Sequence, residues 1–588
     1  MFDTIIKGGS IVDGTGDKAF SGDIAIKDGR IAEIGRVSGT ARDEIDADGA
    51  VITPGFIDLH THYDGQFVWD DTLDPSFSHG VTTAIGGNCG VGFAPVEEEF
   101  RRPLVEMMEG VEEIPGIVLD EGLDWKWRTF GEYLDRIDQN RFTMDVATHI
   151  THAPLRVFAM GERAIKHEKA TPEDIECMAK ITREAMEAGA AGFSSGRLME
   201  HLSSKGDHVP GTFANDDELL ALASAMGSAG HGVFQMIPKG AIGNILDPDD
   251  MTDNRVAELE RLVRLTRAAG RPSTYTVIEF SDEPDNRRYL IEETDRVMSQ
   301  SPGLEMHPQC AARGVGSIQM LESHHPFKFK PAYMEIAHMP LKQRAEAMRD
   351  PACKEAILAQ DHAPPEGTDP MIARMVPRLF EFAGRNYLIT DHVNYEPKPE
   401  DRIEVLARKA GKSPIEFLYD HLTAGDGKNV AISFVLNYNE GNLDETYEML
   451  ANPNVISGLG DGGAHVKLIC DASMPTFQLA FWTRDRTRGP TLPLEYIVRK
   501  ITGDAARLYG MDDRGTLAVG QRADINILDY HRLSLGVPEM RYDLPSGGQR
   551  IHQASSGYLA TMVNGTITRR NDLDTGARPG RLYRSSAN

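Results

Sequence analysis

Between Pro54 and about residue 510, apolar runs of strand length alternate with helical patterns. This alternation is typical of βαβ units and therefore predicts a parallel sheet covered by helices. One helix is predicted in detail, with Thr171 as its N-cap, Pro172 in the first turn and Gly189 at its end. The runs read as strands are 80–86, 145–150, 190–195, 232–237, 273–278 and 454–461.

The two ends of the chain have a different character. Residues 1–53 consist of short, partly alternating apolar runs separated by turns such as Gly8-Gly9 and Asp28-Gly29, which predicts a small sheet. From about 511 the chain again favours strands, with a final hairpin turning at Asn564-Gly565. A proline-rich stretch at about 320–400 breaks the alternation and is interpreted either as an insertion, in the manner of a lid, or as long surface loops.

Composition excludes several classes of function. A net charge of −27 argues against nucleic acid and anionic membranes as partners. Five scattered cysteines without CxxC spacing favour a reducing, cytoplasmic location. We see no signal peptide at the start of the sequence and no apolar run long enough to span a membrane.

The motif His60-Thr61-His62 follows the Pro-Gly break at Pro54 and a short apolar run that reads as a buried strand. Side chains at i and i+2 share one face of a strand, so Asp58, His60 and His62 are expected to point the same way. Two neutral imidazoles that converge suit a divalent cation, above all zinc. The alternative is a pair of hydrogen-bonded histidines near a turn.

Two further residues stand in glycine-rich segments after predicted strands. Cys89 lies in Gly-Gly-Asn-Cys-Gly and Asp461 in Gly-Asp-Gly-Gly-Ala-His, which ends at His465. Taken alone, Cys89 reads as a small buried side chain and Asp461 as part of a turn. A cysteine nucleophile is a weaker alternative, since no Cys-His-Asn arrangement is evident.

Together, the segment 53–66, the Gly-Asn-Cys-Gly segment and the Gly-Asp-Gly-Gly-Ala-His segment resemble the amidohydrolase superfamily, in its D-aminoacylase (N-acyl-D-amino-acid deacylase) branch. The resemblance implies an α/β fold: a (β/α)8 TIM-like barrel over 54–510, with a small β-sandwich formed by 1–53 and 511–588.

The resemblance also assigns roles to residues. It implies that His60, His62, Cys89 and Asp461 are metal ligands and that Asp461 is also the catalytic proton shuttle. Three more residues match motifs of the branch and are expected to bind substrate: His152, Arg197 and His465.

The sequence also departs from the branch. Metal-binding histidines are expected after the fifth and sixth strands, but 232–237 and 273–280 contain none. The basic residue that holds the substrate carboxylate beyond the sixth strand is also missing, and Glu279 lies nearby. Gln235 or Glu279 could supply oxygen ligands instead; the remaining candidate histidines are His149, His201 and His307. We therefore expect one firmly bound zinc ion, with cobalt or manganese as alternatives.

The expected function is metal-dependent hydrolysis of an amide C–N bond in a small molecule, resembling N-acyl-D-amino-acid deacylases. The alternatives are hydrolysis of cyclic amides, as in hydantoinases or dihydroorotases, and hydrolysis of amides without a carboxylate. A degenerate, non-catalytic amidohydrolase is a further alternative. A homo-oligomer is compatible with the sequence.

Overall fold

Eight parallel strands form a barrel in the computed structural model, which describes residues 1–243, 254–280, 285–391 and 393–587. Three of them pair in the order β6-β7-β8 and five in the order β10-β11-β12-β13-β17, with the short β9 beside β10. A bridge between Thr61 and Gly462 joins the first strand to the segment after the eighth. The predicted barrel is therefore confirmed. Its eight strands are β6 (Phe56–Asp58), β7 (Val81–Gly86), β8 (Asp145–Thr148), β10 (Gly192–Gly196), β11 (Val233–Ile237), β12 (Ser273–Thr276), β13 (Met306–Cys310) and β17 (Ile456–Ser457); the short β9 is Ile150–Thr151.

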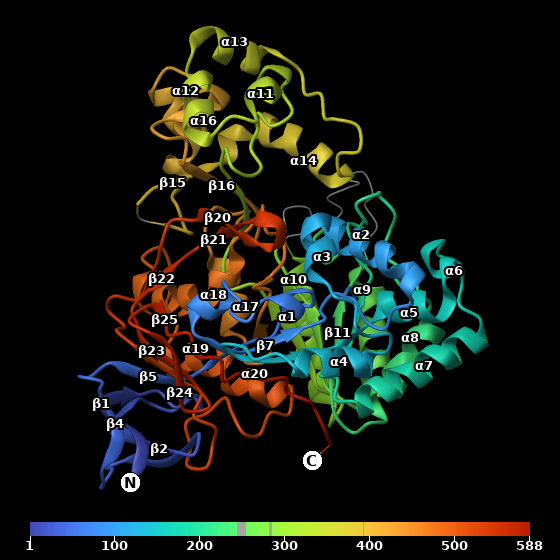
Figure 1. The fold of residues 1–588 in the computed structure, drawn as a ribbon, viewed down its shortest axis with the longest axis vertical. Helices are drawn as coiled ribbons and strands as arrows, with labels where there is room; N and C mark the ends of the chain where they lie inside the picture. The colour runs from blue at the N-terminus through green and yellow to red at the C-terminus, as the bar shows by residue number, and fades with distance from the viewer. Residues whose placement is uncertain (244–253, 281–284, 392, 588) are drawn as a thin grey trace.

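Helices follow the strands and cover the outside of the barrel (Figure 1). The predicted helix is α7, where Thr171 and Asp174 form a capping box and Pro172 opens the first turn. The principal helices are α2 (Arg101–Glu112), α4 (Phe130–Asp138), α5 (His152–Met160), α7 (Pro172–Glu187), α8 (Asp216–Gly227), α9 (Arg255–Ala269), α10 (Asn286–Gln300), α17 (Asp444–Ala451), α19 (Leu494–Ile501) and α20 (Gly503–Leu508). None of the helices among the described residues combines the length and apolar character needed to cross a membrane.

Both ends of the chain enter one nine-stranded sheet. Strand β18 lies between β5 and β23 and is antiparallel to both, so N-terminal and C-terminal strands lie side by side (Figure 1). The finer prediction of two facing sandwich layers stays a prediction. The strands are β1 (Phe2–Ile11), β2 (Phe20–Lys27), β3 (Arg30–Gly35), β4 (Ala41–Asp46), β5 (Val51–Pro54), β18 (Ile525–Leu528), β23 (Tyr558–Val563), β24 (Thr566–Arg570) and β25 (Leu573–Asp574).

One N-terminal turn prediction is wrong. Gly8-Gly9 does not separate two strands, because β1 runs through it with a shift of register opposite β2. The shift is a bulge, which glycine tolerates; Gly8 has a φ of 69°. By contrast, the turns at Asp28-Gly29 and Asn564-Gly565 connect paired strands as predicted.

Asp145 ties the barrel to the C-terminal part of the chain. Its carboxylate accepts from Arg514 at 2.8 Å and from Arg522 at 3.0 Å, and its side chain is 5% exposed. It also accepts from the backbone N–H of Arg581. This buried cluster fixes β8 against segments that come more than 360 residues later in the chain.

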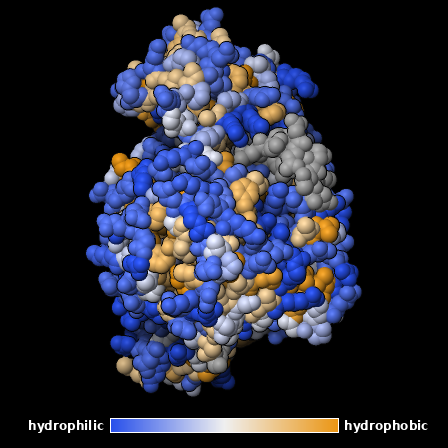
Figure 2. All heavy atoms as spheres, turned by 90° about the vertical axis from the view of Figure 1, so that its right-hand side faces the viewer, coloured by the Kyte–Doolittle hydropathy of each residue, from blue (hydrophilic) through white to orange (hydrophobic). Residues whose placement is uncertain are grey.

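A lobe formed by residues 315–436 projects from one end of the barrel (Figures 1 and 2). It enters through β14 (Val315–Gln319) and leaves through β16 (Val430–Leu436). Strand β16 lies between β14 and β15 (Tyr387–Ile389) and pairs with both. Phe327, Tyr419 and Leu422 belong to its separate apolar core. The insertion predicted at about 320–400 falls within the lobe; the domain boundaries stay predictions. Its helices are α11 (Pro331–Ile336), α12 (Leu341–Met348), α13 (Pro351–Ala359), α14 (Pro370–Glu381), α15 (Ile403–Lys409) and α16 (Pro414–Thr423).

Candidate metal centre

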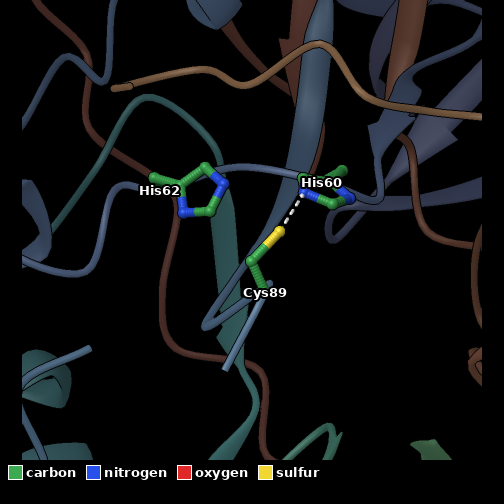
Figure 3. Close-up of side chains that lie close together, drawn as sticks. All are labelled: His60, His62 and Cys89. Atoms are coloured by element: carbon green, nitrogen blue, oxygen red, sulfur yellow. Dashed lines mark hydrogen bonds between the residues drawn. The ribbon is translucent and has the colours of Figure 1, made fainter. Parts of the chain in front are cut away.

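His60 and His62 follow the end of β6 and converge (Figure 3). Their ring centroids are 5.4 Å apart and both side chains are buried. Between them, the backbone N–H and the hydroxyl of Thr61 donate to the carbonyl of Ile85, and the N–H of His62 donates to the carbonyl of Gly462. The strands on either side therefore hold the motif in place. The carboxylate of Asp58 accepts from Ser76 and from the N–H of His60.

Cys89 lies next to His60. Its Sγ is 3.3 Å from His60 Nε2, and one atom from each of His60, His62 and Cys89 lies within 4.8 Å of the others (Figure 3). A left-handed backbone, with a φ of 56°, turns the cysteine into the site. Its N–H donates to Gln235 Oε1 at 3.0 Å. Burial, with the negative charges of nearby acids, raises the pKa of the Cys89 thiol in the absence of a cation.

Asp461 completes the cluster from the segment after β17. Its Oδ1 is 3.5 Å from His60 Nε2 and 3.9 Å from His62 Nε2. Its side chain is 23% exposed, whereas those of the two histidines are at most 2% exposed. Asp461 is thus the member of the cluster that a molecule arriving from solvent can reach.

The four side chains fit a divalent cation. Gln309 Oε1 lies 2.7 Å from His60 Nδ1. Because that oxygen can only accept, the proton of His60 is placed on Nδ1 and the lone pair of Nε2 faces Cys89 and Asp461. Burial, with the neighbouring imidazoles, lowers the pKa of His62, which favours the neutral form that metals bind. Two imidazoles, a thiolate and a carboxylate form a set that zinc accepts.

Glu112, at the end of α2, is a site residue that the sequence did not reveal. Its Oε1 is 3.2 Å from His62 Nδ1, although the ring N–H is not aligned for a hydrogen bond, and its Oε2 is 3.7 Å from His465 Nε2. Burial raises the pKa of this carboxyl to about 8. No local signal separates Glu112 from the other acids of α2, since its position depends on how the helix packs over the barrel.

His465 stands between two acids. Its Nδ1 is 3.4 Å from Glu113 Oε2, and Glu112 lies on the other side of its ring. Burial alone would lower its pKa, but the hydrogen bond to Glu113 and the surrounding acids raise the pKa of His465 to about 9. Glu113 also lies 3.7 Å from His324 of the lobe, so this cluster connects the metal centre with the lobe.

The structure places His152 and Arg197 in networks within the protein. His152 lies 2.9 Å from both Ser195 Oγ and Glu218 Oε1, one through each ring nitrogen. Arg197 uses Nε for Glu258 and Nη1 for the carbonyl of Ala214. Because these polar atoms have protein partners, the prediction that the two residues bind substrate has no support in this arrangement.

The other candidates also have separate roles. His149 bonds to the Gly86 carbonyl and to Tyr509, and His307 to the carbonyl of Asn454. Glu279 accepts from Asn439. The oxygen of Gln235 accepts from Cys89, and both oxygens of Glu279 accept from Asn439, so each proposed substitute already has a partner within the protein. Burial lowers the pKa of His201 to about 3, and the charges of the nearby His465 and His60 contribute to this shift.

The chain is similar to known proteins over nearly its whole length. The pattern of the family described as "Amidohydrolase family" matches residues 43–569. The chain is 24% identical to D-aminoacylase of Alcaligenes xylosoxydans xylosoxydans, covering 100% of this chain and 98% of that protein. It is 27% identical to an uncharacterized protein of Mycobacterium tuberculosis, over 96% of this chain and 91% of the other.

Solved structures show the same fold. The crystal structure of D-aminoacylase has a TM-score of 0.63 with 22% identity and covers 99% of both chains. N-acyl-D-glutamate deacylase from Bordetella bronchiseptica, solved with zinc and a phosphonate inhibitor, has a TM-score of 0.64 with 22% identity, covering 99% of this chain and 100% of the other.

Proposed function

The chain belongs to the amidohydrolase family, and on that premise we propose that it hydrolyses the amide C–N bond of N-acyl-D-amino acids with one bound divalent cation. The observation that carries the proposal is the convergence of His60, His62, Cys89 and Asp461 from three separate strand ends. Catalytic groups of such barrels gather at the ends of the strands.

His60 and His62 through Nε2, Cys89 through Sγ and Asp461 through Oδ1 would hold the cation. When bound, a divalent ion acts as a Lewis acid toward the carbonyl and lowers the pKa of water to near 7. Zinc suits the thiolate best, with cobalt or manganese as substitutes. Gln309 accepts from His60 Nδ1 and so orients the first imidazole. Glu112, 3.2 Å from His62 Nδ1, would accept from the second imidazole once that ring turns to bind the cation.

Asp461 is the proposed proton shuttle. Its carboxylate would accept the proton of the attacking water at an oxygen and pass it to the nitrogen of the leaving amine. Its partial exposure suits this role, because the amine must leave toward solvent. His465 lies between Glu112 and Glu113 behind the site, and we assign it an electrostatic role toward the bound substrate.

A single cation is supported by two points. Oxygen donors from the fifth and sixth strands are occupied by protein partners, as described for Gln235 and Glu279. D-aminoacylase is described as having a binuclear centre in which one metal activates and the second attenuates. A one-ion site would therefore retain the activating function.

The substrate class is supported by the relatives. Besides D-aminoacylase, they include N-acyl-D-aspartate deacylase and N-acyl-D-glutamate deacylase of Alcaligenes xylosoxydans xylosoxydans, at 31% and 32% identity over 39% of this chain. Loss of the expected basic residue near Glu279 means that the carboxylate of such a substrate would be held by other groups.

The test combines metal content with turnover. Purified without chelator, the wild type should carry about one zinc per chain and should hydrolyse N-acetyl-D-amino acids in preference to their L-forms. Cys89→Ser should lose metal, and Asp461→Asn should lose turnover by at least about a hundredfold. His531→Gln, a change at an exposed residue of the C-terminal part of the chain, is the control. A wild type that takes up no zinc, cobalt or manganese would disprove the proposal.

A further inference from the structure

Four polar side chains form a continuous patch inside the barrel, which we call the polar floor: Gln235 on β11, Thr274 and Thr276 on β12, and Gln309 on β13. Gln235 pairs in register with Thr274, and Thr276 pairs with Gln309. Register partners, and residues two apart on one strand, share a face of the sheet. All four side chains are at most 2% exposed.

The polar floor lies directly beside the metal centre. Gln235 Oε1 accepts from the N–H of Cys89, and Gln309 Oε1 lies 2.7 Å from His60 Nδ1. Both contacts need an acceptor, because a backbone N–H only donates and a metal-binding imidazole carries its proton on the other nitrogen. The oxygen of each amide must therefore face Cys89 or His60, and the NH2 group must point away from that contact.

These NH2 groups have no hydrogen-bond partner within the part of the chain that the structure describes, and neither do the hydroxyls of Thr274 and Thr276. An unpaired buried polar group costs about 1–3 kcal/mol, and these four groups, which come from three adjacent strands, need partners that the described chain does not supply. An amide NH2 only donates. The missing partner is therefore a hydrogen-bond acceptor, and a cation is disfavoured at this position.

We propose that the polar floor is a binding subsite for an oxygen acceptor of the substrate, namely the carbonyl oxygen of the amide that is cleaved. The identification of that oxygen rests on the proposed function; the requirement for an acceptor does not. As water attacks the carbonyl carbon, the C=O electron pair moves onto this oxygen, and fixed donors stabilise the charge that develops there. When the C–N bond breaks, the pair returns and the nitrogen leaves with a proton.

The floor also accounts for one departure from the D-aminoacylase pattern, the missing histidines of the fifth and sixth strands. Three of its four residues lie on the fifth and sixth strands, where that pattern expects metal-binding histidines. Neutral donors on these strands would replace the electrostatic contribution of a second cation. The chain would then need only the cation held by His60, His62, Cys89 and Asp461.

Acetate binding to the zinc-loaded protein tests the subsite without requiring turnover. Acetate carries two acceptor oxygens and resembles the acyl product. Calorimetry should show that Thr276→Val and Thr274→Val, which remove a hydroxyl at nearly constant volume, each weaken acetate binding about tenfold. Gln235→Glu keeps the acceptor for Cys89 but replaces the NH2 group by oxygen; it should weaken acetate binding further and raise the zinc content above that of the wild type.

Gln319→Glu is the matched control. Gln319 in the lobe is also fully buried, accepts from Asn386 and has an unpartnered NH2 group, but it lies outside the floor. It should leave acetate affinity and zinc content unchanged. Wild-type affinity and zinc content in Thr276→Val and Gln235→Glu would overturn the subsite. If the variants show these shifts but the wild type cleaves no N-acyl amino acid, the result would support the subsite and contradict the proposed function.

Discussion

Replacing Glu112 by glutamine tests how the second histidine is positioned. Glu112 Oε1 lies 3.2 Å from His62 Nδ1, and both side chains are 2% exposed, so solvent does not screen the pair. When a metal binds Nε2, its positive charge favours the ionised form of Glu112, and the protonated Nδ1 needs an acceptor; a carboxylate is a stronger acceptor than an amide oxygen. Loss of such a partner weakens metal affinity by about 10–100-fold, or roughly 1.4–2.7 kcal/mol.

Zinc affinity can be measured by competition with a chromophoric chelator, on the wild type and on Glu112→Gln at the same pH. Glu113→Gln is the matched control, because Glu113 contacts His465 and His324 but not His62. We expect the loss in Glu112→Gln and less than threefold change in Glu113→Gln, since the latter leaves His62 untouched. Equal affinity in Glu112→Gln and the wild type, or an equal loss in both variants, would refute this role for Glu112.

Three further predictions concern stability. Asp145→Asn removes a buried carboxylate that pairs with two arginines, so it should lower the free energy of unfolding by denaturant by about 3–5 kcal/mol. Asp43 forms an exposed ion pair at 3.6 Å, and Asp43→Asn should lower it by less than about 1 kcal/mol. Equal losses in the two variants would contradict the argument. The pKa of His465 is raised to about 9, so the stability that its protonated form contributes is complete below about pH 6.5 and is lost as the pH rises through 9. Over that pH range, the unfolding midpoint of the wild type should fall more than that of His465→Gln. Parallel curves for the two proteins would contradict this prediction. Phe327→Ala removes a fully buried ring from the lobe core and should lower the free energy of unfolding of the lobe by about 3–5 kcal/mol. Calorimetry should then show the lobe unfolding at a lower temperature, with the barrel transition unchanged. An unchanged lobe transition would show that this core does not stabilise the lobe.

Much of the fold could be predicted because its local patterns are strong. The helix capped by Thr171, the hairpin at Asn564-Gly565 and the apolar strands β7 and β11 each carry their signal within a few residues. Strand β13 was missed, because Met-His-Pro-Gln-Cys is polar and contains a proline, which argues against a central strand. Its identity as a strand comes from its neighbours in the closed barrel.

The site was predictable where its residues lie in motifs at strand ends. His60, His62, Cys89 and Asp461 lie together as expected, because parallel strands bring their ends to one edge. Glu112 and Gln309 could not be found in this way, since their roles depend on tertiary packing between distant segments. His152 matched a motif, but its buried partner Glu218 lies 66 residues away and cannot be inferred from that motif.

The place of β18 between β5 and β23 has a consequence for biosynthesis. Val51 on β5 pairs with Leu528, so the N-terminal strands leave the ribosome long before their partner exists. At about 5–20 residues per second, the roughly 480 intervening residues take about half a minute to a minute and a half to be made. During that time the edge of β5 has no neighbour on one side and can pair with other nascent chains. Slower translation of the barrel should therefore lower the yield of native protein, and chaperones that cover exposed strand edges should restore it.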